Sequence, residues 1–111
     1  MQLNFKVIDK TLVISFNGEL DHHMADEVRT KIDSYYVEKS LKNIVFDLKG
    51  LNFMDSAGIG LIMGRYKIAS QNGGKIYLIN ASSRVKKILN MSGMMKIVKI
   101  YDSLNDALDN L

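Results

Sequence analysis

Apolar and polar residues alternate along the chain in short blocks, and five of these blocks predict β-strands. The first two, LNFKVID (3–9) and TLVISFN (11–17), are rich in β-branched and aromatic residues and flank a polar break at Asp9-Lys10. This pattern predicts two strands joined by a tight turn. Further apolar blocks each predict a single strand: NIVFDL (43–48), KIYLIN (75–80) and KIVKIY (96–101).

Between the predicted strands, apolar residues recur at the spacing of three and four that is typical of helices. A first helix within residues 18–40, with Asp21 as its candidate N-cap, is indicated by Ala25, Val28, Ile32 and Tyr35 or Tyr36. The segment MDSAGIGLIMGRY (54–66) predicts the start of a second helix, which ends near the paired glycines Gly73-Gly74. Two shorter helices are predicted by SSRVKKILNM (82–91) and SLNDALDNL (103–111).

These elements follow one another in the order β-β-α-β-α-β-α-β-α. Strands that alternate with helices after a leading hairpin predict an α/β fold with a mixed, mostly parallel sheet of about five strands, covered by about four helices. No linker, internal repeat or low-complexity segment interrupts the pattern. Residues 1–111 are therefore expected to form one domain.

Composition excludes some chemistry and gives a broad class. The chain has 111 residues and no cysteine, so disulfides and thiolate-bound metals are excluded. The net charge of +3 is spread along the chain and says little about partners. Neither a signal peptide nor a stretch near the roughly 20 apolar residues of a membrane span is present. We expect a cytoplasmic protein that does not bind membranes, and a monomer because no heptad or extended apolar repeat is visible.

The glycines of the second predicted helix raise the question of a nucleotide or phosphate site. A dinucleotide fingerprint needs glycines spaced G-x-G-x-x-G. Gly58 and Gly60 supply the first pair, but Met63 occupies the third place and Gly64 comes one residue late. The G-K-[ST] ending of a phosphate loop is absent. The sequence therefore predicts no cofactor.

Ser56 lies on a predicted strand-to-helix turn, where a nucleophile elbow would place a catalytic serine, and a small serine hydrolase is the competing hypothesis from another functional class. A nucleophile elbow, G-x-S-x-G, needs a glycine two residues before the serine, where this chain has Met54. The only available bases are His22 and His23, and adjacent helical residues point about 100° apart. No third residue is evident to orient either histidine, so we expect no enzymatic activity.

Metal and nucleic-acid sites are also weakly supported. Asp26 has helical spacing to His22 or His23, but two ligands make a poor metal site, and we expect none. The one basic concentration, around Arg84, Lys86 and Lys87, has few aromatic neighbours and no groove-reading motif, so no nucleic-acid partner is expected.

Capping accounts for part of the MDSAGIG segment but not for its glycines. Asp55 or Ser56 can accept hydrogen bonds from the free amides of the first helical turn, which is worth about 1 kcal/mol. A glycine inside a helix costs roughly 0.5–1 kcal/mol relative to alanine. Gly58, Gly60 and Gly64 therefore indicate that bare backbone is needed, either against the sheet or against a partner.

A phosphate on Ser56 would change this surface without unfolding the domain, because a helix N-terminus favours negative charge. It would add about −1.5 to −2 charges beside Asp55 and obstruct a docking partner. Ile59 and Met63 are either exposed apolar contacts or core residues. Met91, Met94 and Met95 form a flexible cluster that either adapts to a partner or belongs to the core.

Three segments together resemble the anti-sigma factor antagonists of spore-forming bacteria, which are single STAS domains, and in particular the sporulation members of that family. They are GELDHHMADEVR (18–29), FMDSAGIGLIMGRYK (53–67) and MSGMMKI (91–97). The resemblance runs in order along essentially the whole chain and implies the STAS fold. An antagonist of a stress-response sigma factor is the alternative within the family.

The resemblance implies a partner-switching mechanism. The unphosphorylated protein would bind an anti-sigma factor that is also a serine kinase, and so release the sigma factor. That kinase would use ATP as its co-substrate to phosphorylate the serine of the M-D-S motif, Ser56, and a metal-dependent serine phosphatase would reverse the step. Many relatives have a second serine next, where this chain has Ala57. Asp21 matches the family aspartate implicated in kinase contact.

The expected partner-binding surface therefore joins two parts of the chain, around the DHH motif and around the M-D-S motif. Both lie at predicted strand-to-helix junctions, and the carboxyl ends of parallel strands share one rim of a sheet. We expect Asp21 and Ser56 to lie close together on that rim. The residues assigned to the surface are Asp21, His22, His23, Asp55, Ser56, Ala57, Gly58, Ile59 and Gly60.

Overall fold

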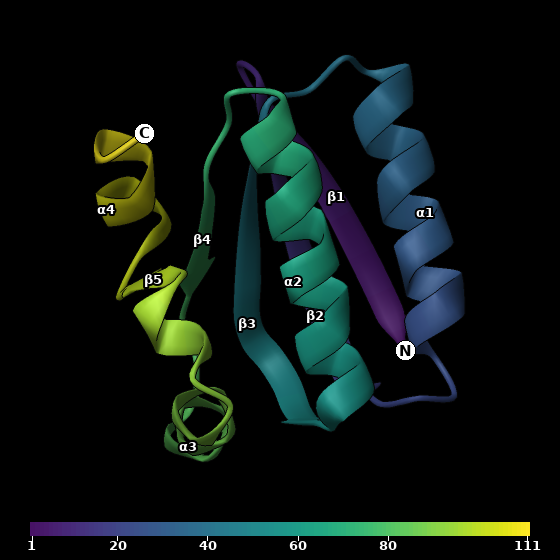
Figure 1. Cartoon of the computed structure of the whole chain (residues 1–111), viewed down its shortest axis with the longest axis vertical. Helices are drawn as coiled ribbons and strands as arrows, with labels where there is room; N and C mark the ends of the chain where they lie inside the picture. The colour runs from purple at the N-terminus through teal and green to yellow at the C-terminus, as the bar shows by residue number, and fades with distance from the viewer.

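A five-stranded mixed sheet forms the centre of the protein in the computed structural model, which describes residues 1–111 (Figure 1). The strands lie side by side in chain order, β1 to β5. The β1–β2 pair is antiparallel and the other three pairs are parallel. The strands are β1 (Gln2–Ile8), β2 (Thr11–Leu20), β3 (Asn43–Met54), β4 (Ile76–Ile79) and β5 (Lys99–Tyr101).

Each parallel pair of strands is joined by a helix, because parallel neighbours need a long crossover connection. The helices are α1 (Ala25–Glu38), α2 (Ser56–Gln71), α3 (Ser83–Met91) and α4 (Leu104–Asp109), with a short 3₁₀ helix η1 (Met94–Lys96) before β5. The predicted α/β class, the mixed sheet and the order of elements are confirmed. None of these helices combines the length and the apolar character needed to cross a bilayer.

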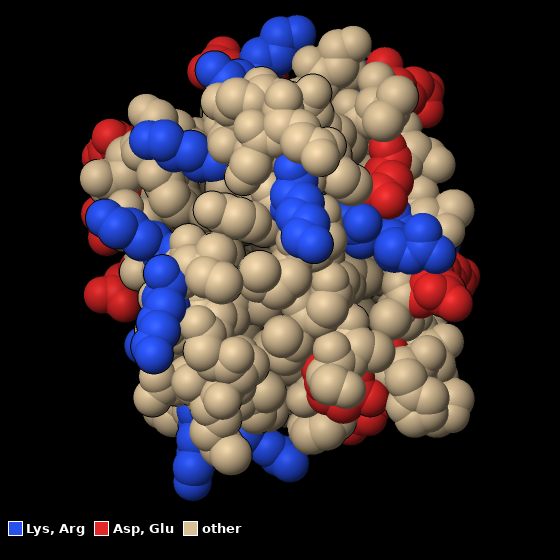
Figure 2. Space-filling model, viewed as in Figure 1, with Lys and Arg blue, Asp and Glu red and all other residues tan.

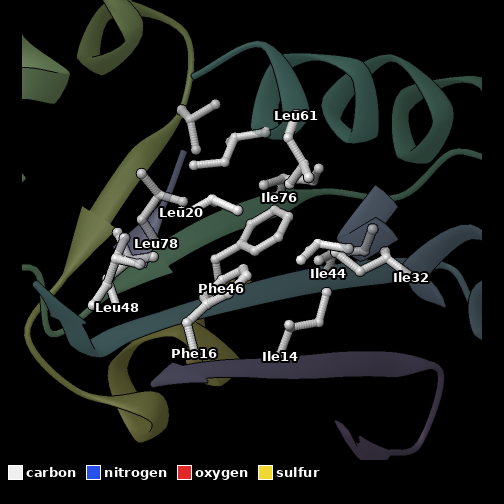
Figure 3. Close-up of a cluster of buried hydrophobic side chains, with 14 of the residues drawn as sticks. Ile14, Phe16, Leu20, Ile32, Ile44, Phe46, Leu48, Leu61, Ile76 and Leu78 are labelled. Carbon is white, nitrogen blue, oxygen red and sulfur yellow. The ribbon is translucent and has the colours of Figure 1, made fainter. Parts of the chain in front are cut away.

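The two faces of the sheet are covered unequally, and β3 shows why. Its alternate residues Ile44, Phe46 and Leu48 belong to the large core cluster, which also contains buried residues of α1, α2 and α3. Val45, between them, belongs to a smaller cluster on the other face with Ala107 of α4. In Figure 3 the Phe46 ring points from the sheet toward Leu61 of α2. The alternation of a strand thus fixes which helices cover which face.

The helices α1 and α2 lie next to each other over the sheet and are linked by one ion pair (Figure 1). The Arg65 side chain of α2 is 8% exposed, and its Nε lies 3.0 Å from Oδ1 of Asp33 in α1. Burial lowers the pKa of Arg65, and the Asp33 carboxylate only partly offsets this. The ion pair thus connects the two helices at a buried position.

Strands β2 and β3 are longer than their hydropathy predicts. Residues 18–20, expected in the segment of the first helix, extend β2, and β3 continues to Met54. Register shifts between β2 and β3 allow this extension. Gly50 permits the close approach, because a Cβ there would clash with the carbonyl oxygen of Phe16. Pairing with a neighbour, rather than local hydropathy, sets where these strands end.

The segment KIVKIY, predicted as a strand from residue 96, forms a strand only over Lys99–Tyr101. Gly93, with φ of +79°, instead turns the chain into η1. Met94 is buried in this helix, as a core residue would be, whereas Met91 is 80% exposed and Met95 40% exposed. The methionine cluster is therefore divided between the core and the surface.

Candidate functional site

The DHH and M-D-S motifs lie side by side at one rim of the sheet, as expected. β2 and β3 are parallel, and their last residues, Leu20 and Met54, pair with each other. The chain leaves β2 into the β2–α1 turn, residues 21–24, and leaves β3 directly into α2. Asp21 is thus the first residue after β2, and Ser56 is the second residue after the adjacent strand β3. The prediction that they share this rim is confirmed.

The Asp55 carboxylate is the centre of the site, because it bonds to both motifs. Its Oδ1 accepts hydrogen bonds from the backbone amides of Ala57, at 2.9 Å, and Gly58, at 3.4 Å, which makes Asp55 the N-cap of α2. Its Oδ2 accepts from the backbone amide of His22, at 3.0 Å, and lies 3.1 Å from Nδ1 of the His22 ring. One side chain therefore holds the β2–α1 turn against the start of α2.

These hydrogen bonds change the acidity of Asp55. Partial desolvation alone would raise the pKa of the carboxyl group, but the hydrogen bonds from the side chain and backbone of His22 and from the amides of Ala57 and Gly58 lower it below its usual value. The native fold therefore favours the charged carboxylate. At neutral pH the group is an anion that accepts hydrogen bonds from both sides.

Asp21 does not cap α1, in contrast to the sequence prediction. The helix begins at Ala25 and its N-cap, Met24, makes no side-chain cap bond. Asp21 instead closes the preceding turn: its Oδ1 accepts from the amide of His23 at 2.9 Å, and its carbonyl oxygen accepts from the amides of Met24 and Ala25. Desolvation raises the pKa of Asp21, but hydrogen bonds from His23 bring it below the usual value.

The two histidines are both exposed but differ in their contacts. Their rings lie 4.0 Å apart between centroids and are tilted by 37°. The ring of His22 faces Asp55, whereas Nδ1 of His23 lies 3.5 Å from Oδ2 of Asp21 within the same turn. Acidic side chains gather near the lower end of α2 in Figure 2, on the face that α1 and α2 cover.

Ser56 is the first residue of α2 and is exposed. Asp55 makes the capping bonds, so the Ser56 side chain is not needed as a cap. None of the four surface hollows is lined by Ser56, His22 or His23. The serine is presented on an open surface rather than inside a cleft.

The three glycines of α2 serve different purposes. A Cβ on Gly58 would lie 2.9 Å from the carbonyl oxygen of Leu20 and 3.0 Å from Cβ of Met54, so this glycine lets α2 start close against the strand ends. Cβ atoms on Gly60 or Gly64 would meet nothing within 4 Å. Only Gly58 is therefore explained by packing within the domain.

Two of the three remaining residues assigned to the surface are partly covered. Ala57 and Ile59 are half-buried, and Ile59 packs against the main core cluster together with Met63. Gly60 is exposed. The outward surface at the start of α2 therefore consists mainly of Ser56 and the bare backbone around Gly60.

The geometry gives little support to the catalytic alternatives. The His22 ring is bonded to Asp55. No group of three or more histidine, cysteine, aspartate or glutamate residues is placed to hold a metal ion. What the arrangement offers is a surface built from two chain segments, with an exposed hydroxyl next to the Asp55 carboxylate that joins them.

Comparison with known proteins identifies the fold family. A model of the STAS domain matches residues 2–107. The chain belongs to the STAS domain family. An anti-sigma F factor antagonist of Paenibacillus polymyxa is 43% identical over 100 residues, which cover 90% of this chain and 86% of the relative. An anti-sigma-B factor antagonist of Staphylococcus aureus is 26% identical over 104 residues, which cover 92% and 95%.

Two solved structures of SpoIIAA resemble this chain in fold. The anti-sigma factor antagonist SpoIIAA in its unphosphorylated form gives a TM-score of 0.76 at 27% identity, covering 98% of this chain and 96% of that one. The Bacillus cell fate determinant SpoIIAA in its phosphorylated form gives 0.75 at 29% identity, covering 98% of each. Both states of SpoIIAA therefore share the overall fold of this STAS domain.

Sequence reasoning missed two contacts at this rim of the STAS domain. The His22–Asp55 contact joins residues 33 positions apart, and only the pairing of β2 with β3 brings them together. Arg84 at the start of α3, interpreted as part of a solvated face, lies over the ring of Phe53 at 5.8 Å. The sequence signals this contact only by placing the basic Arg84 after β4 and the aromatic Phe53 near the end of the adjacent strand β3.

Asp55→Ala is expected to reduce the free energy of unfolding by about 1 kcal/mol, because it removes the cap of α2. Asp55→Asn keeps a hydrogen-bond acceptor and removes the negative charge, so it measures the contribution of the charge alone. The pKa of Asp55 is lower in the native state than in the unfolded state, where it is about 3.9. The negative charge therefore stabilises the fold fully at pH values above the unfolded pKa. This stabilisation is lost as the pH falls through the native pKa. In urea titrations the difference between wild type and Asp55→Asn should shrink on acidification. A difference that stays constant with pH would contradict this.

Gly58→Ala and Gly60→Ala form a matched pair within one helical turn. Gly60→Ala should raise the free energy of unfolding by up to about 1 kcal/mol, because the new methyl group meets open space. Gly58→Ala should lower it, because its methyl group must displace the end of β2. Urea denaturation of both variants measures the contrast. Equal stabilisation by the two substitutions would show that Gly58 is not a packing residue.

Proposed function

We propose that this STAS domain is an anti-sigma factor antagonist: it binds an anti-sigma factor and thereby releases the sigma factor. The observation that carries the proposal is the Asp55 carboxylate, which holds the β2–α1 turn and the start of α2 together as one surface. The proposed contact residues are the sequence-assigned set, Asp21 to His23 and Asp55 to Gly60. Membership of the family and the names of its relatives support this function.

The binding is proposed to be switched by phosphorylation of Ser56. The anti-sigma factor would itself be the kinase, with ATP as its co-substrate and no cofactor in this chain. The γ-phosphoryl group would pass to Oγ of Ser56: a new O–P bond forms, the bond to the bridging oxygen of ADP breaks, and the hydroxyl proton leaves. The exposure of Ser56 at the first position of α2 supports this role, because a kinase must reach the hydroxyl.

The charge of the phosphate explains why it would prevent binding without unfolding the domain. It adds about −1.5 to −2 charges and three acceptor oxygens. Asp21 and Asp55 are already present at the same rim, and the only side-chain partner of each carboxylate is a histidine ring, with no lysine or arginine beside it. A surface that fits the kinase in its unmodified state would then carry excess negative charge and added volume at its centre.

A metal-dependent serine phosphatase is proposed to restore the unmodified form. In this scheme the protein is a substrate and a ligand of other proteins, acts as a monomer, and works in the cytoplasm where sigma factors meet RNA polymerase. The higher identity to the sigma F antagonist than to the sigma-B antagonist favours a sporulation sigma factor. A stress-response sigma factor is the alternative within the same function.

Incubation with the host's anti-sigma kinase and magnesium-ATP should add one phosphate to Ser56, which peptide-resolved mass spectrometry locates. Ser56→Ala should abolish the modification and retain binding to the kinase. Ser83→Ala is the matched control, because Ser83 is likewise an exposed first residue of a helix, α3, behind a capping residue. That variant should be phosphorylated as the wild type is.

A phosphate on a residue other than Ser56 would refute the proposed switch. So would the absence of any phosphate, provided that the kinase is active on a second substrate. The competing hydrolase hypothesis predicts a different result: the isolated protein would have an esterase activity that Ser56→Ala abolishes.

A further inference from the structure

His22 supplies two of the four hydrogen-bond contacts of the Asp55 carboxylate, one from its backbone and one from its ring. A histidine ring donates to a carboxylate through Nδ1 only when Nδ1 carries a proton, and in the neutral tautomer that does so, Nε2 is free to accept a second proton. The His22 side chain is 70% exposed, whereas that of Asp55 is 26% exposed. His22 thus places an exposed, titratable ring against the residue that precedes Ser56.

A phosphate on Ser56 would meet a helix start whose donors are partly occupied. The amides of Ala57 and Gly58, which would otherwise attract an anion, already donate to Asp55. No lysine or arginine pairs with Asp55. The nearby group that can still gain positive charge by taking a proton, and that already contacts the carboxylate, is the His22 ring.

We propose that His22 is the positioning residue that responds to the phosphate: its ring takes a proton at Nε2 and, as an imidazolium, bonds to Asp55 through Nδ1–H and to the Ser56 phosphate through Nε2–H. The inference rests on the proposed modification of Ser56. The proton comes from solvent and forms the new Nε2–H bond, and no other covalent bond is made or broken. The consequence is that the β2–α1 turn stays attached to α2, so the phosphate itself, and not a rearranged turn, excludes the partner.

The charges around the ring favour this proton uptake. The groups that face His22 are Asp55 from α2 and, within its own turn, His23 and, through that residue, Asp21. An opposite charge within about 4–6 Å moves a titration by one to three units. His23 is the internal reference, because its ring nitrogen lies near Asp21 and makes no contact with Asp55.

The test places phosphoserine at position 56 by genetic-code expansion, so that it needs no kinase. NMR titration of the ring protons then follows both histidines in the unmodified and the phosphoserine protein. We expect the midpoint of the His22 titration to move to higher pH by about one unit or more, and that of His23 to move by less than half as much. Mass spectrometry verifies the phosphate before the titration.

Two variants separate proton uptake from a structural role. His22→Gln keeps a donor for Asp55 but cannot take a proton, whereas His23→Gln removes the neighbouring ring. If folding raises the pH midpoint of the His22 titration, the protonated ring stabilises the folded phosphoserine protein at pH values below that midpoint. This stabilisation is lost as the pH rises through the midpoint. The melting temperature of the phosphoserine protein should therefore decrease as the pH is raised from about 6 to about 8. The same decrease should occur in the His23→Gln variant, which retains His22. It should be absent from the His22→Gln variant.

An unchanged His22 midpoint, or one that moves no more than that of His23, would overturn the inference. That result would not bear on the proposed function, because the phosphate is placed during synthesis. Conversely, a kinase that leaves Ser56 unmodified would refute the switch even if His22 responds to an encoded phosphate. The two failures are thus distinguishable.

Discussion

The hydrogen bonds of the Asp55 carboxylate are the interaction on which the site depends. One oxygen caps α2 through Ala57 and Gly58, and the other accepts from His22 in the β2–α1 turn. Without this carboxylate, the two segments would be neighbours on the sheet rim with no polar side-chain contact between them. With it, they form one surface, and the exposed Ser56 lies beside the group that joins them.

The sheet makes this interaction possible by fixing where the strands end. β2 and β3 run parallel to a shared last pair, Leu20 and Met54, and Gly58 allows α2 to begin directly above that pair. The core behind the site is apolar and buried, with Phe16 and Phe46 stacked at 5.9 Å between ring centroids. Such a core resists deformation. We therefore expect a change of charge at the rim to alter the surface there and to leave the core unchanged.

Local patterns in the sequence predicted the class and order of the elements, because the strands are apolar blocks and the helices carry a 3.6-residue repeat. They missed the extension of β2 through Gly18 and Glu19, since only pairing with β3 makes these polar residues a strand. They placed Asp21 as a helix cap, whereas the intervening turn delays α1 to Ala25. The closeness of Asp21 and Ser56 followed from parallel topology, but the His22–Asp55 bond needed exact register.

The central claim is that this rim binds an anti-sigma factor and that a phosphate on Ser56 ends the binding. The most direct test is calorimetric titration of the anti-sigma factor with the unmodified protein and with the protein carrying phosphoserine at position 56. The account predicts tight binding of the first and at least roughly 100-fold weaker binding of the second, a difference of about 2.7 kcal/mol. Equal affinities for the two forms would contradict it.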